Sequence, residues 1–328
     1  MPQVRKHALS LIGFSTLFVV LTQLTGCDGC NRGDVTTQHN DIFRTGAYLS
    51  ETRLTPDEVL KHGLKGRYLS DDLDENILTQ PLYVRNVAFS TGNANGVFVA
   101  TKGNWVYALN ADAEENIEKW RTDLIKLIYP DKRVGGNFEV HPRGVNSTPV
   151  IDVRENRMYV LFSTGFNPRY PEVLDWPLCK EIINMEHLEN LNVEYFLAAL
   201  DIRNGQLVDN PDGSKMLVSI SLPKPRPYGL RLEFVGKNQM DRPGMLLDHG
   251  SIYLAFGSLA HAECRDEYDY HGWVFRYRAT DLAFQSVFCT SPGPGEPKRL
   301  RSGIWQGGGG LAADPEGNIY IPYRQWAG

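Results

Sequence analysis

Cysteine, long apolar runs and excess positive charge are all scarce in this sequence. Five Cys among 328 residues are too few for a scaffold of this size built on disulfides. The net charge of −5 at pH 7 provides no basic face for a phosphate backbone, which argues against nucleic acid as a partner. The marked apolar run at residues 8–21 is shorter than the roughly 20 residues that cross a bilayer as a helix.

The motifs of several common enzyme sites are missing as well. The chain has no Gly-x-x-x-x-Gly-Lys phosphate loop, no His-Glu-x-x-His zinc motif and no Gly-x-Ser-x-Gly nucleophile elbow. Turn-forming residues are abundant instead, with 31 Gly and 19 Pro, and 42% of the residues are hydrophobic. This composition predicts many turns, few long helices and a sizeable core.

The first residues have the pattern of an export signal. A short basic stretch at residues 5–7 precedes the apolar run, and the run is followed by Leu24-Thr25-Gly26-Cys27. That tetrapeptide resembles the lipobox of bacterial lipoproteins, in which the Cys is acylated and becomes the first residue of the mature protein. The resemblance implies a signal peptide over 1–26, a lipid anchor on Cys27 and a polar tether over 27–37. The alternative is an ordinary signal peptide with an accidental Cys, and the sequence leaves open whether the inner or the outer membrane holds the anchor.

The remaining chain repeats one pattern of short apolar strands. A strand led by Pro or Gly is followed by a turn and by a second strand with an aromatic residue at a fixed place, namely Phe98, Tyr159, Tyr253 or Tyr320. The paired strands are expected at 80–84 with 96–100, 148–152 with 157–161, 242–247 with 251–255, and 309–314 with 318–321. Third strands are expected at 106–112, 197–205 and 273–281, and fourth strands at 119–122, 217–221 and 284–288.

Four short strands separated by turns are the unit of a β-propeller blade. Each such sheet has two apolar faces, so it must stack against neighbours around an axis. We therefore predict an all-β fold over residues 38–328, a β-propeller of four-stranded blades with about four to five blades present. The last repeat contains only two strands, which predicts an incomplete ring and a truncated member or fragment of a longer product. A β-sandwich is the structural alternative, but it would not repeat the same phrase in order.

Several phrases resemble those of quinoprotein-dehydrogenase propellers, which bind pyrroloquinoline quinone (PQQ). Ala199-Leu200-Asp201 with Asn204-Gly205 is similar to the A-x-D-x-x-T-G phrase of that repeat, and residues 108–112 with Trp120 form a looser copy. The opening residues 38–47 also resemble the start of secreted bacterial proteins with such propellers.

The resemblance also implies parts that a working dehydrogenase requires. These are an adjacent Cys-Cys disulfide over the cofactor, a Trp platform beneath it, Glu and Asn ligands to calcium, and an Asp base. No two Cys are adjacent in this chain, so the most diagnostic part is missing and no catalytic residue is identified. PQQ and Ca²⁺ remain cofactors by resemblance only.

Three sets of residues are candidates for a site. Trp305, Gly307 and Gly308 are candidates for lining the central funnel and binding a cofactor, and the alternative is simple packing between blades. A loop with His261, Glu263, Asp266 and His271 offers ligands for a divalent metal, and the alternative is a solvated acidic loop. In an oxidising compartment Cys264 and Cys289 are candidates for a disulfide.

We consider three functions from these observations. The first is a cell-envelope lipoprotein whose propeller is a binding or assembly module without a complete catalytic site, exported to the periplasm or exterior. Its partners would be the membrane through its lipid and a protein or small molecule on the propeller face. The second is a PQQ-dependent alcohol or sugar oxidoreductase whose other site residues lie outside this chain. The third is an outer-membrane assembly scaffold lipoprotein.

Overall fold

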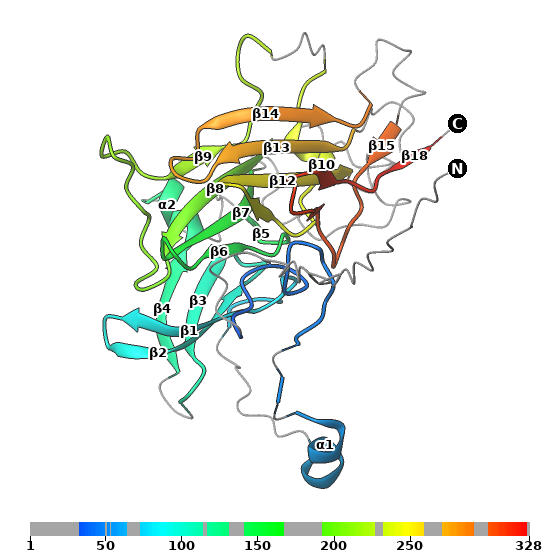
Figure 1. Ribbon diagram of the computed structural model, residues 1–328. Coiled ribbons are helices and arrows are strands. Elements are labelled where there is room, and N and C mark those ends of the chain that lie inside the picture. The colour runs from blue at the N-terminus through cyan, green and yellow to red at the C-terminus, as the bar shows by residue number, and fades with distance from the viewer. Residues whose placement is uncertain are drawn as a thin grey trace, which may run out of the picture.

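The computed structural model describes ten stretches of the chain, which contain its sheets and short helices (Figure 1). The described residues are 33–49, 51–52, 54–63, 73–113, 117–130, 141–166, 192–226, 232–258, 271–291 and 301–326. The expected lipoprotein signal over 1–26 and the first part of the tether lie outside them. Within this part of the chain, none of the helices is long and apolar enough to cross a membrane.

The first blade is a meander of four antiparallel strands in chain order. These are β1 (Leu82–Phe89), β2 (Gly92–Ala100), β3 (Trp105–Asn110) and β4 (Glu118–Asp123). A short helix, α2 (Leu124–Ile128), follows, and the Asp123 carboxylate caps it by accepting from the N–H groups of its first turn. The strands match those expected from the first copy of the repeat.

The second and third blades have the same order, but their first strand is split into two pieces. In the second blade, β5 (His141–Gly144) and β6 (Val150–Asp152) both pair with β7 (Arg157–Phe166), and β8 (Asn192–Asp201) and β9 (Leu217–Ser219) follow. In the third blade, β10 (Gln239–Met240) and β11 (Leu246–Asp248) pair with β12 (Ser251–Ser258). Strands β13 (Trp273–Arg278) and β14 (Phe284–Cys289) complete it.

The last described strands form half of a further blade. β15 (Arg301–Gly303) pairs with β18 (Arg324–Trp326), and β16 (Ala312–Ala313) pairs with β17 (Ile319–Tyr320). Because β15 and β16 correspond to the split first strand of the other blades, we call this unit the half-blade. The described residues thus contain three complete blades and the inner half of a fourth, and the predicted all-β propeller architecture is confirmed.

Two small helices lie outside the blades. Helix α1 (Pro56–His62) begins after Thr55, whose hydroxyl accepts from the Glu58 N–H, and it buries none of its residues. Figure 1 shows it projecting away from the sheets. A 3-10 turn, η3 (Gly236–Asn238), leads directly into β10.

The repeated aromatic residue has the same register in every blade. Phe98, Tyr159, Tyr253 and Tyr320 each pair with the residue that opens the preceding strand, respectively Leu82, Val150, Leu246 and Ala312. The predicted equivalence of these four positions is therefore confirmed. Their environments differ, since Phe98 and Tyr159 are buried whereas Tyr320 is 55% exposed.

The hydrophobic core consists of layers between successive blades. In β8, Leu197 and Ala199 belong to the layer shared with the third blade, whereas Ala198 and Leu200 belong to the layer shared with the first blade. A further layer, which includes Leu246, lies between the third blade and the half-blade. Burial of near-continuous apolar strands on both faces stabilises the stack by roughly 25 cal/mol for each Å² removed from water.

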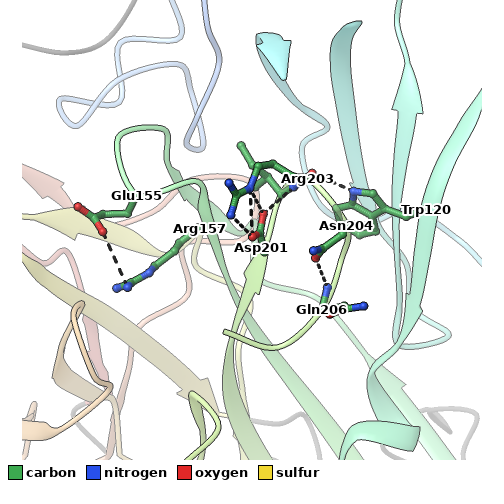
Figure 2. Close-up of polar contacts among 8 residues, drawn as sticks. Trp120, Glu155, Arg157, Asp201, Arg203, Asn204 and Gln206 are labelled. Atoms are coloured by element: carbon green, nitrogen blue, oxygen red, sulfur yellow. Dashed lines mark hydrogen bonds and ion pairs between the residues drawn. The ribbon is translucent and has the colours of Figure 1, made fainter. Parts of the chain in front are cut away.

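The Ala-Leu-Asp phrase forms a turn that receives the Trp of the preceding blade (Figure 2). The indole Nε1–H of Trp120 in β4 donates to the Ile202 carbonyl at 2.8 Å, which joins the first blade to the second. The Asp201 carboxylate accepts from the Arg203 backbone N–H at 2.9 Å and pairs with its guanidinium. Partial burial opposes ionisation of Asp201, but the hydrogen bonds from Arg203 hold the pKa of Asp201 below its usual value.

Gly205 closes this turn in the left-handed region, with φ +72°. A Cβ at this position would lie against the Trp120 ring and 2.6 Å from the Thr122 hydroxyl, whose own hydrogen bond goes to the Gly205 carbonyl at 2.7 Å. The Asn-Gly of the repeat phrase is thus required by the close approach of two blades.

We predict that Gly205→Ala lowers the free energy of unfolding by about 3 kcal/mol or more, because strain at positive φ adds to overpacking against Trp120. Urea unfolding followed by tryptophan fluorescence measures the change. Gly213→Ala is the matched control, since Gly213 has φ +84° with no atom within 4 Å of the added Cβ, and it should cost only about 1–2 kcal/mol. Equal losses in the two variants would contradict the blade contact as the cause.

Candidate functional site

One segment near the N-terminus crosses the first strands of the blades. We call residues 35–46, blue in Figure 1, the crossing segment. Val35 forms a bridge with Tyr83 of β1, with both N–H···O distances 2.8 Å. The carbonyl of Thr36 accepts from the Ile151 N–H of β6, and that of Ile42 accepts from the Ala313 N–H of β16, each at 2.9 Å. The segment therefore joins blades that are far apart in sequence.

The guanidinium of Arg44 is the centre of these contacts. Its Nε donates to the Leu311 carbonyl and its Nη2 to the Met245 carbonyl, both at 2.8 Å. Its Nη1 donates at 2.6 Å to the Thr37 hydroxyl and to the Gln38 carbonyl. Burial lowers the pKa of Arg44 to about 10, an effect partly offset by the Asp41 carboxylate, so the side chain remains a cation at neutral pH.

Gln38 forms a second junction beside Arg44. Its Oε1 accepts from the buried Thr148 hydroxyl, and its Nε2 donates to the Gly308 carbonyl at 3.1 Å. Thr148 Oγ1 in turn accepts from the Gln80 N–H at 2.9 Å, just before β1. One chain of hydrogen bonds therefore runs from the first blade to the half-blade.

The predicted cofactor residues lie in this central region. The Gly307 N–H donates to the Trp305 carbonyl at 2.6 Å and the Gly309 N–H to the Gln306 carbonyl at 3.0 Å, so both are used within the loop. The Gly308 carbonyl accepts a hydrogen bond from Gln38 Nε2. Trp305 is partly buried, and its ring lies next to Gly257 of β12.

Several donors in these surroundings are not free to bind an anionic quinone cofactor. PQQ carries carboxylates, which require cations and free N–H donors. Among the described residues of this region, Arg44 directs all its hydrogen bonds to backbone carbonyls and to Thr37, and the N–H groups of Gly307 and Gly309 are already paired. The assignment of Trp305, Gly307 and Gly308 to a cofactor stays a prediction that the geometry here does not favour.

The predicted metal loop is described only at its end. His271 is buried, and its Nδ1 lies 2.6 Å from the Ser291 hydroxyl, which also accepts from the Ser302 hydroxyl at 3.0 Å. His261, Glu263 and Asp266 lie outside the described residues. In the described ranges no group of three or more His, Cys, Asp or Glu is placed to hold a metal ion, and the metal site stays a prediction.

The predicted covalent sites are likewise tested only in part. Cys289 is buried with a free thiol, and burial raises the pKa of this thiol to about 11. Its expected disulfide partner Cys264 and the expected lipid anchor Cys27 both lie outside the described residues. The disulfide and the anchor stay predictions.

A cavity that the sequence did not predict lies between the second and third blades. Its volume is about 490 Å³, and it is lined by residues 36–37, 40–42, 150–154 and 247–250. These are the crossing segment, the turn from β6 to β7 and the turn from β11 to β12. Three of the lining residues are acidic, namely Asp41, Asp152 and Asp248. The feature of the sequence that indicates this cavity is an Asp at the end of the first strand in two successive blades, Asp152 and Asp248.

The cavity and the predicted metal site lie at opposite ends of the sheets. In an antiparallel meander, the turns from first to second strand all lie at one end, and the loops from second to third strand lie at the other. The cavity is built from turns of the first kind, whereas His271 directly precedes the third strand β13. The structure thus brings together residues that differ from those singled out in the sequence.

No protein-family model matches the chain, and no curated protein matches it. Among solved structures, the quinohemoprotein alcohol dehydrogenase ADHIIG of Pseudomonas putida HK5 covers 89% of this chain at 16% identity with a TM-score of 0.46. A europium-containing methanol dehydrogenase covers 88% at 13% identity with a TM-score of 0.44. BamB of Moraxella catarrhalis covers 63% at 8% identity with a TM-score of 0.18.

The matched region is a minor part of the two dehydrogenases. It spans 34% of the first and 41% of the second, and 64% of BamB. A quinohemoprotein alcohol dehydrogenase is thus one of the proteins to which this chain is similar, and it is of the type that the repeat phrases of the sequence predicted.

Proposed function

We propose that this chain is a cell-envelope lipoprotein whose quinoprotein-like propeller is a binding or assembly module and not an oxidoreductase. The observation that supports this most directly is the filling of the central region by the crossing segment. Ligands of propellers commonly bind over the axis, where loops and inner strands converge. Here the side chains of Gln38 and Arg44 lie against the inner strands, and their hydrogen bonds go to the protein itself.

Two further observations agree with this proposal. The sequence contains no adjacent Cys pair, which the resemblance makes the most diagnostic part of a quinoprotein site. Acidic residues outnumber Arg and Lys residues in the lining of the cavity between the second and third blades, a setting that disfavours an anionic quinone there. An outer-membrane assembly scaffold is a specific form of the same function, with a protein as the partner.

The open edge of the half-blade suits a partner that adds β-strands to it. Phe288, Tyr320 and Tyr323 are 49%, 55% and 50% exposed, and they belong to the third blade and the half-blade. Among the described residues no third strand pairs with β17 or β18, so backbone groups at this edge of the half-blade have no strand partner. We propose that further blades of a longer polypeptide cover this side, which makes the present chain a truncated propeller.

The second candidate is a PQQ-dependent oxidoreductase of alcohols or sugars whose remaining site residues lie outside this chain. This chain spans less than half the length of the dehydrogenases to which it is similar. The short matched length favours this second candidate, because it leaves room for the remaining site residues outside the chain. The two candidates differ in whether the chain binds a quinone.

We predict no saturable binding when the full chain is titrated with PQQ and Ca²⁺, and no reduction of an artificial electron-acceptor dye with ethanol or glucose. The physical reason is that Arg44 and the N–H groups of Gly307 and Gly309 are already paired. A quinohemoprotein dehydrogenase assayed in parallel is the positive control. Stoichiometric PQQ binding with dye reduction that requires Ca²⁺ would overturn the proposal and support the oxidoreductase.

We predict that Cys27→Ala abolishes incorporation of labelled palmitate in a bacterial host and moves the protein from the membrane to the soluble fraction, because the acylated thiol is lost. Labelling followed by membrane fractionation measures both effects. Cys30→Ala is the matched control, three residues further along the same polar stretch, and it should behave as the unmodified chain does. Lipid labelling that persists in Cys27→Ala would show that Cys27 is not the anchor.

A further inference from the structure

The turn between the third and fourth strands of a blade accepts a hydrogen bond from the preceding blade at two junctions. Between the first and second blades the donor is the Trp120 indole and the acceptor is the Ile202 carbonyl (Figure 2). Between the second and third blades the Tyr159 hydroxyl donates to the Ala279 carbonyl at 2.8 Å. Both acceptors stand at the same distance along the chain from the residue that pairs with the repeated aromatic residue of their own blade. A side chain of the preceding blade therefore reaches an equivalent backbone acceptor at both junctions.

The identity of the donor follows from the side chains that each blade offers at this junction. In the first blade the repeated aromatic residue is Phe98, which has no hydroxyl, and Trp120 of the fourth strand provides the hydrogen bond. In the second blade the position that corresponds to Trp120 is occupied by Met216, which has no donor, and the Tyr159 hydroxyl provides the hydrogen bond. The third blade has Tyr253 at the repeated aromatic position, so Tyr253 is the expected donor to the next blade.

No acceptor of this kind faces Tyr253 among the described residues. In them the half-blade has a first and a second strand only, so it lacks the turn that joins a third strand to a fourth. The Tyr253 hydroxyl has no hydrogen-bond partner in the described ranges, and the Arg276 guanidinium lies 5.6 Å from the centroid of its ring. Tyr159 at the equivalent place is fully buried, whereas Tyr253 is only partly buried. The third blade therefore presents an open donor at the place where the second blade makes its contact.

The apolar face of the third blade continues beyond the part that the half-blade covers. Ala255, Val274 and Phe288 pair across β12, β13 and β14, so their side chains lie on one face of the sheet. Ala255 and Val274 are buried in the layer shared with the half-blade, whereas Phe288 is 49% exposed. The equivalent of Phe288 in the second blade is Val218, which packs into the layer shared with the third blade. A third and a fourth strand beside β17 and β18 would cover Phe288 in the same way.

We propose that this face of the third blade binds a β-hairpin, which consists of the third and fourth strands of a blade and pairs antiparallel with β17 and β18. The Tyr253 hydroxyl donates to a backbone carbonyl in the turn of the hairpin, and an apolar side chain of the hairpin covers Phe288. The hairpin belongs to the further blades of a longer polypeptide, so its docking rests on the truncated propeller of the proposed function. Tyr253 is then the residue that joins the added strands to the third blade.

An extended chain tests the docking of such a hairpin. A copy of residues 273–289 is joined after Gly328 through a flexible Gly-Ser linker, because this hairpin already accepts a Tyr hydroxyl in its turn. Hydrogen–deuterium exchange then follows the N–H groups of residues 319–326. We expect their exchange to slow ~tenfold or more relative to the unextended chain, since pairing protects the open edge. An extension with the same residues in scrambled order is the control, and equal exchange in the two extended chains would overturn the docking.

Two Tyr→Phe variants test the contact itself. Tyr253→Phe should lower the urea midpoint of the extended chain by ~0.5 M, as one lost hydrogen bond does, and leave that of the unextended chain unchanged. Tyr159→Phe is the matched control, since its hydroxyl is bonded to Ala279 in both chains, and it should lower both midpoints by ~0.5 M. An unchanged midpoint in extended Tyr253→Phe would refute the Tyr253 contact alone, whereas failure of the edge protection as well would also refute the longer propeller.

Discussion

The contact between Arg44 and the carbonyls around it is the constraint on which the described fold depends most. First strands of several blades converge near one axis, where backbone carbonyls would be buried without partners if nothing filled the centre. The planar guanidinium reaches Leu311 and Met245, which belong to different blades, and also the Gln38 carbonyl of its own segment. The rigid, planar guanidinium of Arg, with several N–H donors, can bind several carbonyls at once better than the flexible ammonium of Lys can.

The convergence also explains where glycine is needed. Gly244 and Gly310 lie on the third blade and the half-blade and form a bridge with each other. A Cβ on Gly310 would lie 2.8 Å from the Gly244 carbonyl and 3.2 Å from Arg44 Nε. Close packing of backbone on backbone thus places Arg44 within reach of its acceptors.

The sequence predicted those features that each blade repeats within itself. The alternation of buried faces in β8 and the register of Phe98, Tyr159, Tyr253 and Tyr320 follow from local patterns, because a sheet that buries both faces must be apolar along each strand. Trp120 and the turn that ends at Gly205 were recognised as parts of two separate copies of the repeat, and the contact between them was not predicted. Local patterning was sufficient for the features within a blade.

Contacts between distant segments could not be predicted in this way. Residues 38–47 were recognised as a typical opening phrase, but nothing local indicates that Arg44 bonds to Leu311, 267 residues away. The cavity is assembled from three segments, and its acids Asp152 and Asp248 were overlooked because strand-end Asp residues are common in turns. The candidates chosen from the sequence, Trp305 and His271, lie instead at the inner strands and at the other end of the sheets.

The central claim, that Arg44 holds the first strands together, is tested most directly by the unfolding free energy of Arg44→Met compared with Arg203→Met. Arg203 pairs with Asp201 at the surface, so its loss should cost less than about 1 kcal/mol. Loss of the partly buried Arg44 leaves several inner carbonyls unpaired and should cost about 3–5 kcal/mol in urea unfolding. Equal, small losses in both variants would contradict the account.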